Sequence, residues 1–149
     1  MAMLLVHPVR FFELLPRIPD MRAPALFLIF SGFPAAVVWQ LFWGLYPTLV
    51  ALVLPLPLSF LLAGLYHLGV LDGRHGYVVT WRVLAYPLGF YLPFAAVPLL
   101  GPLWAAYFGF VLIPLGLAEV HEVGRLRAVL FCAAIGVVFG AAYYILSVA

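Results

Sequence analysis

Long runs without a charged side chain alternate with short charged segments along this sequence. The uncharged runs are residues 23–71, 83–118 and 128–149. One helical crossing of a membrane takes about 20 residues. The first two runs are therefore each long enough for two crossings and the third for one, so the pattern predicts five membrane-spanning helices.

Turn residues divide the two longer runs. The first run divides at Tyr46-Pro47 and the second at residues 98–102, which begin and end with proline. Proline lacks a backbone N–H and breaks helices. Helix is expected in every span, because in lipid each backbone group must be satisfied within its own segment unless a barrel closes. One membrane domain, 1–149, is expected, with spans at 25–45, 48–70, 79–98, 102–118 and 127–147.

The segment before the first span, residues 7–22, is predicted to form a short amphipathic helix in the membrane interface. Pro8 suits the first position of a helix and Pro16 ends it. Helical spacing turns Phe11 and Phe12 toward lipid and puts charged residues on the other side. The predicted fold class is therefore all-α, an integral membrane bundle of five transmembrane helices preceded by an interfacial amphipathic helix.

The arginines set the expected orientation. With five spans they all lie on one side, before the first span, around the second connector and in the fourth: Arg10, Arg17, Arg22, Arg74, Arg82, Arg125 and Arg127. The other side has no charged side chain. Because arginine-rich connectors stay in the cytoplasm, the N-terminus is expected in the cytoplasm and the C-terminus outside. Four or six spans would divide the arginines between the two sides.

Composition supports a membrane location. Of the 149 residues, 68% are hydrophobic and 8% are charged, whereas a soluble domain carries about 25% charged residues. Such a chain has too few charges to cover a surface that faces water. The formal net charge of +2 is too small to indicate nucleic-acid binding. Cys132 is the single cysteine, so an internal disulfide is excluded, and its apolar neighbours indicate an inert thiol.

The densest charged run, around Glu119, His121 and Glu122, has the residue types of a metal site. On a helix, however, the two acids share one side while His121 points elsewhere, and the HExxH spacing is absent. We interpret the run as the end of a span, with Gly124 stopping the helix and Arg125 and Arg127 anchoring the next one. No catalytic residue, metal or cofactor is therefore expected, and the protein is interpreted as non-enzymatic.

Prolines also interrupt the second, third and fourth predicted spans, at Pro55, Pro57, Pro87, Pro93 and Pro114. Adjacent interrupted helices can form a transporter site. A coupled transporter usually needs carboxylates inside the membrane, and no acid or lysine lies inside these spans. Kinks that shape the bundle are the favoured interpretation. A passive transporter or channel for a small neutral or lipid-like solute is the alternative.

The last span contains Gly136 and Gly140 at GxxxG spacing, with Ala133 on the same face. Small residues at this spacing allow two helices to approach closely. The contact is either within the bundle or in a homo-oligomer, and the sequence leaves both open.

Several motifs, taken in order, resemble the Yip (Ypt-interacting protein) family of membrane proteins. They extend over nearly the whole chain and are Pro8-x-x-Phe11-Phe12, Thr80-Trp-Arg-Val-Leu-Ala-Tyr86, Pro93-x4-Pro98-x2-Gly101, and Gly116-Leu-x-Glu119-x-His121 with Arg127-Ala128. The resemblance implies five spans and a cytoplasmic N-terminus. Eukaryotic members of the family are linked to Rab-type GTPases, vesicle traffic and membrane shaping, often as oligomers. The short form is similar to the prokaryotic branch, which implies the plasma (inner) membrane.

The expected function is therefore that of a membrane scaffold, an adaptor or an accessory subunit. Its expected partners are the lipid bilayer and other membrane proteins or further copies of itself. The candidate contact residues lie on the cytoplasmic side: Phe11, Phe12, Arg82, Tyr86, Pro87, Glu119, His121, Arg125 and Arg127.

Overall fold

The computed structural model describes residues 2–148, with the side chains of all but Ala2, Tyr143, Leu146 and Val148. This part of the chain is helical and contains no strand. The helices are α1 (Ala2–Val6), α2 (Pro8–Glu13), α3 (Arg22–Trp43), α4 (Leu45–Val53), α5 (Pro55–Leu68), α6 (Tyr77–Ala95), α7 (Leu100–Tyr107), the π-helix η1 (Phe108–Leu112), α8 (Ile113–His121) and α9 (Arg125–Val148). The predicted all-α class is confirmed.

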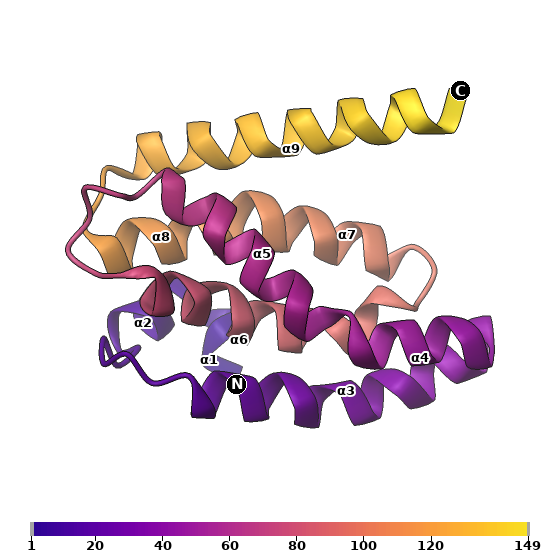
Figure 1. Cartoon of the computed structure of the whole chain (residues 1–149). Helices are drawn as coiled ribbons and strands as arrows, with labels where there is room; N and C mark the ends of the chain where they lie inside the picture. Colours follow the sequence, from indigo (N-terminus) through magenta and orange to yellow (C-terminus); the bar gives the residue numbers. More distant parts are fainter. Residues whose placement is uncertain (1, 149) are drawn as a thin grey trace.

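The longer helices form five units in the predicted order: α3, the pair α4 and α5, α6, the continuous stretch from α7 to α8, and α9 (Figure 1). Three stretches are long and apolar enough to cross a membrane, namely Arg22–Trp43, Leu100–His121 and Arg125–Ala142, and the bent pair α4–α5 would be a fourth. The chain therefore has several apolar helices of membrane-spanning length. Five crossings go beyond this finding and stay a prediction.

Helix α6 lies at the centre of the bundle and packs against α3, α5, α7 and α8 (Figure 1). Every residue from 79 to 85 is buried. Close packing on α3 depends on Gly89, because a Cβ there would lie 2.6 Å from Cε1 of Phe27. Since other helices cover α6 on most sides, its side chains mainly contact protein rather than the outside of the bundle.

The first turn of the bundle is at Gly44, and the predicted break at Tyr46-Pro47 is wrong. Helix α3 ends at Trp43 and α4 begins at Leu45. Gly44 has φ +83°, a conformation that costs glycine little because it has no Cβ. Proline at the third position of α4 is tolerated there, since the first N–H groups of a helix have no partner within it. The Nε1 of Trp43 donates to the carbonyl of Ala96, 2.8 Å away, and so joins α3 to the end of α6.

The prolines deform the helices to different degrees. The axis bends by 48° between α4 and α5, where Pro55 begins the second helix. The π-helix η1 lies directly before Pro114. A proline ring clashes with the carbonyl four residues earlier, and a wider helical turn is one way to accommodate it. Pro87 and Pro93 lie inside α6 without dividing it.

The N-terminal helices pack against the bundle, and the expectation that Phe12 faces lipid is wrong. Phe12 is 0% exposed, and α2 packs on α8. A Cβ on Gly116 would lie 2.5 Å from Val83 Cγ1 and 2.8 Å from the Phe12 ring. The ring of Phe12 therefore fills the space that the missing side chain of Gly116 leaves between α6 and α8. Phe11 is half-buried, and its ring meets that of Tyr86 edge-on at 6.1 Å.

Helix α9 packs mainly on α8 and η1 and runs along one edge of the bundle (Figure 1). A Cβ on Gly136 would meet the Phe110 ring at the ordinary distance of 3.5 Å, and one on Gly140 would meet nothing within 4 Å. Ala133 is half-buried on the same helix. Within the described residues, the glycine pair therefore makes no close helix contact.

Candidate functional site: the charged end

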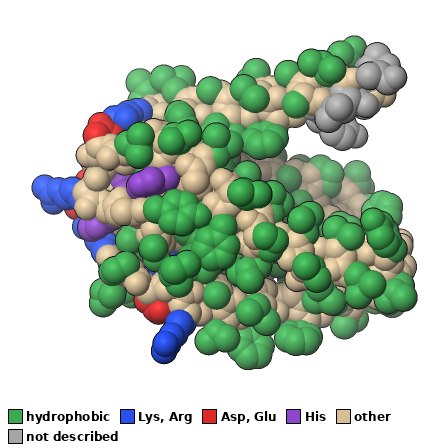
Figure 2. Space-filling view, in the orientation of Figure 1, with side chains coloured by type: hydrophobic (Ala, Val, Ile, Leu, Met, Phe, Trp, Pro, Cys, Tyr) green, Lys and Arg blue, Asp and Glu red, His purple; other side chains and the backbone are tan. Residues whose placement is uncertain are grey.

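Charged and histidine side chains gather at one end of the molecule, and hydrophobic ones cover most of the rest (Figure 2). We call this region the charged end and define it by the members of three ion-pair groups and three histidines: Arg17, Asp72, Arg74, Glu119, Glu122, Arg125, Arg127, His67, His75 and His121. These residues come from the segment after α2, from α5 and the α5–α6 connector, and from the α8–α9 region.

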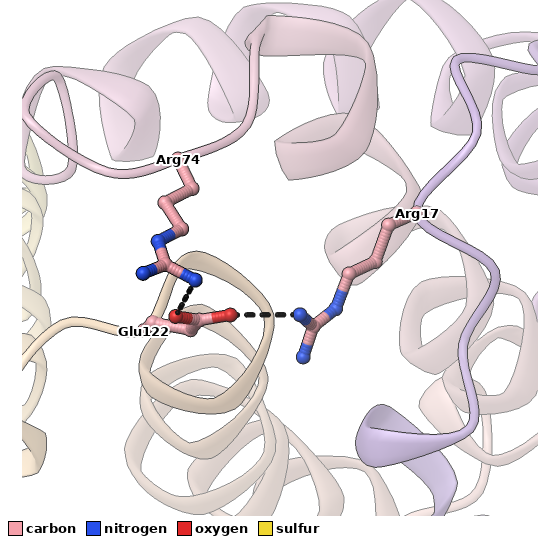
Figure 3. Close-up of polar contacts among 3 residues, drawn as sticks. All are labelled: Arg17, Arg74 and Glu122. Carbon is pink, nitrogen blue, oxygen red and sulfur yellow. Dashed lines mark hydrogen bonds and ion pairs between the residues drawn. The ribbon is translucent and has the colours of Figure 1, made fainter.

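Glu122 joins three distant parts of the chain (Figure 3). Its Oε1 lies 2.8 Å from Nη1 of Arg17, and its Oε2 lies 2.8 Å from Nη1 of Arg74. Glu122 has φ +56° and ends α8, so the predicted helix stop at Gly124 occurs two residues earlier. The carboxylate lies between Arg17 of the N-terminal segment and Arg74 of the α5–α6 connector (Figure 3). Among the described residues, Glu122 pairs with Arg17 and Arg74 and not with Arg125 or Arg82.

Two further ion pairs complete the charged end. Arg127 lies 2.6 Å from Asp72, and Arg125 lies 2.5 Å from Glu119. The hydrogen bond from Arg127 holds the pKa of Asp72 below its ordinary value. A lowered carboxyl pKa favours the folded state above the pKa of the unfolded chain, and this effect is lost as the pH falls through the folded value. Both partners are open to solvent, so water and salt screen the pair strongly.

Beneath the ion pairs, Thr80 connects two imidazole rings. Its Oγ1 lies 2.8 Å from Nδ1 of His67 and 2.8 Å from Nε2 of His121, and thereby links α5, α6 and α8. A hydroxyl has one proton and two lone pairs, so Thr80 can donate to at most one ring and accepts from the other or from both. The tautomers of the two histidines are therefore coupled, because at least one of the facing ring nitrogens carries a proton.

His121 also lines a polar pocket of about 400 Å³, together with Asp72, Arg74, Glu122 and Arg127. The side chain of His121 is 1% exposed, and its Nδ1 makes no hydrogen bond to the described residues. Among the residues that the structure describes, no three His, Cys, Asp or Glu side chains lie close enough to hold a metal ion. The pocket instead offers guanidinium, carboxylate and imidazole groups for polar contacts with a partner.

Arg82 lies near the start of the central helix α6 and is buried within the bundle. The residue is 3% exposed, and its Nη1 donates to the carbonyl of Ile18. No carboxylate lies within ion-pair distance of Arg82 in residues 2–148. A guanidinium stays charged at any ordinary pH. The hydrogen bond to the Ile18 carbonyl therefore offsets part of the cost of burying this charge. Arg82 thus binds the segment after α2 to the central helix.

The structure separates the predicted contact residues into two groups. Glu119, His121, Arg125 and Arg127 belong to the charged end. Phe12, Arg82 and Pro87 are buried, whereas Phe11 and Tyr86 are half-buried against each other, so this second group holds the N-terminal helices and α6 in place.

Six members of the charged end were not among the predicted contact residues. They are Arg17, His67, Asp72, Arg74, His75 and Glu122, and Thr80 was missed with them. One sequence signal was available, because the five-span pattern puts every arginine, including Arg17 and Arg74, on one side of the membrane. Comparison with protein-family models, with curated proteins and with solved structures found no match to this chain. The resemblance to the Yip family stays a prediction from the motifs.

Proposed function

We propose that this chain is a five-span integral membrane protein of the Yip type, which binds other membrane components through its charged end. In this proposal it is a scaffold, an adaptor or the accessory subunit of a larger complex, and it catalyses no reaction. Its membrane is the plasma membrane of a prokaryote, with the charged end in the cytoplasm, because arginine-rich connectors remain on that side.

The bridge from Glu122 to Arg17 and Arg74 is the observation that carries the proposal. Its members are exposed, with side-chain exposures of 36%, 40% and 74%. Exposed ion pairs typically contribute about 0–1 kcal/mol each, so stability alone gives little reason to collect charge here. Paired charges held in fixed positions do provide electrostatic complementarity, which gives a binding surface its specificity.

The hydrogen-bonded chain from half-buried His67 through buried Thr80 to buried His121 supports the same proposal. It joins the helices that lead into the two connectors of the charged end. A binding surface on short connectors needs a rigid support, because ordering it at the moment of binding would cost conformational entropy. The arrangement therefore favours a preformed surface over a flexible one.

Purification in mild detergent tests the proposed binding. The tagged wild-type protein is expected to run as a complex, with another protein or with further copies of itself. Glu122→Gln is expected to shift it toward a single copy, because Arg17 and Arg74 lose their shared partner and their positions. Native mass spectrometry measures the assembly.

Glu13→Gln, which removes an acid that makes no observed ion pair, is the matched control and is expected to behave as wild type. A wild-type protein that runs alone would contradict the proposal.

Reporter fusions test the proposed topology. The reporter is one that is active only outside the cytoplasm. At the C-terminus it is expected to be active, because five crossings separate the C-terminus from the cytoplasmic N-terminus. In the 69–76 connector it is expected to be silent, because two crossings separate that connector from the N-terminus. Protease protection in oriented vesicles is an independent measurement. A C-terminal reporter active only in the cytoplasm would show that the number of crossings is even.

A further inference from the structure

An apolar groove of about 390 Å³ lies on the side of the bundle, away from the charged end. It extends from the turn between α3 and α4 to the bend between α4 and α5, and α6 forms its floor. Its walls include Trp39 of α3, Ala51 of α4, Pro55 and Leu58 of α5, and Tyr91 of α6. Ligand pockets in proteins typically have about 300–1,000 Å³ and mostly apolar walls with a few polar groups, so the groove has the size and lining of a ligand site.

One residue in the wall of the groove, Ala51, has a backbone carbonyl that its own helix cannot satisfy. Pro55 has no N–H, so the carbonyl of Ala51, four residues earlier, receives no helical hydrogen bond. Both residues line the groove, beside the 48° bend between their helices. An acceptor without a donor in an apolar setting is unfavourable, and in lipid no water is available to donate to it. A ligand with a hydrogen-bond donor would satisfy this carbonyl.

The lining also limits the charge of such a ligand. Among the described residues, no Arg, Lys, His, Asp or Glu lines the groove, and the polar side chains of its walls are those of Trp39, Tyr46 and Tyr91. The Trp39 Nε1 already points to the Leu92 carbonyl, 3.4 Å away. A carboxylate or phosphate would lose its hydration here without meeting a cation, which is strongly unfavourable. An uncharged hydroxyl can donate to Ala51 and accept from a tyrosine.

We propose that this groove binds an uncharged long-chain lipid alcohol, whose chain lies between α3, α5 and α6 and whose hydroxyl donates to the Ala51 carbonyl. The site requires that α3 to α6 lie in lipid, as in the function proposed above. It is independent of the charged end, because its walls contain no residue of that region.

Photolabelling tests the proposed ligand with three probes that share one diazirine-bearing chain: the primary alcohol, its methyl ether and its carboxylic acid. The purified protein is reconstituted in lipid nanodiscs, and labelled peptides are identified by mass spectrometry. The alcohol is expected to label residues 45–58 and 88–95 about five-fold more than the ether, which corresponds to one hydrogen bond of ordinary strength. The acid is expected to label least. Equal labelling by alcohol and ether would overturn the proposal.

Two exposed leucines of α5 supply a matched pair of variants. Leu58 lines the groove and Leu61 does not, and they are 38% and 74% exposed. Leu58→Trp is expected to fill the groove and to lower labelling by the alcohol at least about five-fold, because the lipid chain loses most of its apolar contact with the groove. Leu61→Trp is expected to leave labelling unchanged. Circular dichroism and gel filtration confirm that both variants are folded. Unchanged labelling of a folded Leu58→Trp protein would show that the probe binds elsewhere.

Pro55→Ala tests the hydrogen bond separately. Alanine supplies the missing N–H to the Ala51 carbonyl, so the preference for the alcohol over the ether is expected to disappear. A preference that persists in a folded Pro55→Ala protein would show that Ala51 is not the acceptor. These results do not depend on whether the charged end binds a partner, since the probes contact the opposite part of the bundle.

Discussion

Thr80→Val is expected to lower the free energy of unfolding by about 2–4 kcal/mol, because each buried polar group that loses its partner costs about 1–3 kcal/mol. Valine has nearly the shape of threonine but no hydroxyl. The substitution would leave Nδ1 of His67 and Nε2 of His121 without their shared hydrogen-bond partner. Thr80 is 0% exposed, so water has little access to replace the hydroxyl. Thermal and denaturant unfolding in detergent, followed by circular dichroism, measure the change.

Two control substitutions separate this effect from simple repacking. Thr80→Ser keeps the hydroxyl and is expected to retain most of the stability. Thr48→Val removes a hydroxyl that donates a hydrogen bond of 2.7 Å to the Gly44 carbonyl, at the start of its own helix. It is expected to lower the free energy of unfolding less than Thr80→Val does. In protein with ¹⁵N-labelled histidine, the ring nitrogen shifts of His67 and His121 should both change in Thr80→Val. A Thr80→Val protein as stable as wild type would contradict the proposed role of the hydroxyl.

Phe12→Ala is expected to destabilise the protein by about 3–5 kcal/mol, the usual range for truncating a buried aromatic side chain. The ring is 0% exposed and lies over Gly116 beside Val83. Its removal would leave a cavity between α6 and α8 and loosen the N-terminal helices. Denaturant unfolding measures the loss, and limited proteolysis after α2 reports the loosening.

Phe11 is the matched control for Phe12, because it is the neighbouring phenylalanine and is only half-buried. Phe11→Ala is expected to cost clearly less than Phe12→Ala. The reverse order of stability would mean that Phe11, and not Phe12, occupies the space over Gly116. Equal, small losses would instead indicate that Phe12 does not anchor the N-terminal helices to the bundle.

The helical units could be predicted because charge and hydropathy act locally. Removing a charged side chain from water is costly, so the uncharged runs show where helices are covered by lipid or protein. The predicted span 25–45 corresponds to α3 at Arg22–Trp43, and 79–98 corresponds to α6 at Tyr77–Ala95. The pattern places the break at Pro47 rather than at Gly44, because proline inside a helix breaks it. Near the start of a helix, however, proline is compatible with helical structure.

The membership of the candidate site was harder to predict, because its contacts join residues far apart in the chain. Arg17 and Glu122 are separated by 105 positions, and no local spacing relates them. The run from Glu119 to Arg127 was recognised from its density of charge. Arg127 and its partner Asp72 are likewise 55 positions apart, so their pairing follows from the packing of the helices and not from a local pattern.

The sequence by itself determined the apolar character of this protein, its helical units of membrane-spanning length and the gathering of its charges toward one side, because each of these follows from the burial preference of individual residues. The tertiary structure alone decided which way Phe12 and Arg82 point and that Thr80 lies between His67 and His121. It also placed Ala51 and Pro55 in the wall of a groove. These features depend on how helices pack against one another, and packing is a property of pairs of distant residues that the local pattern does not contain.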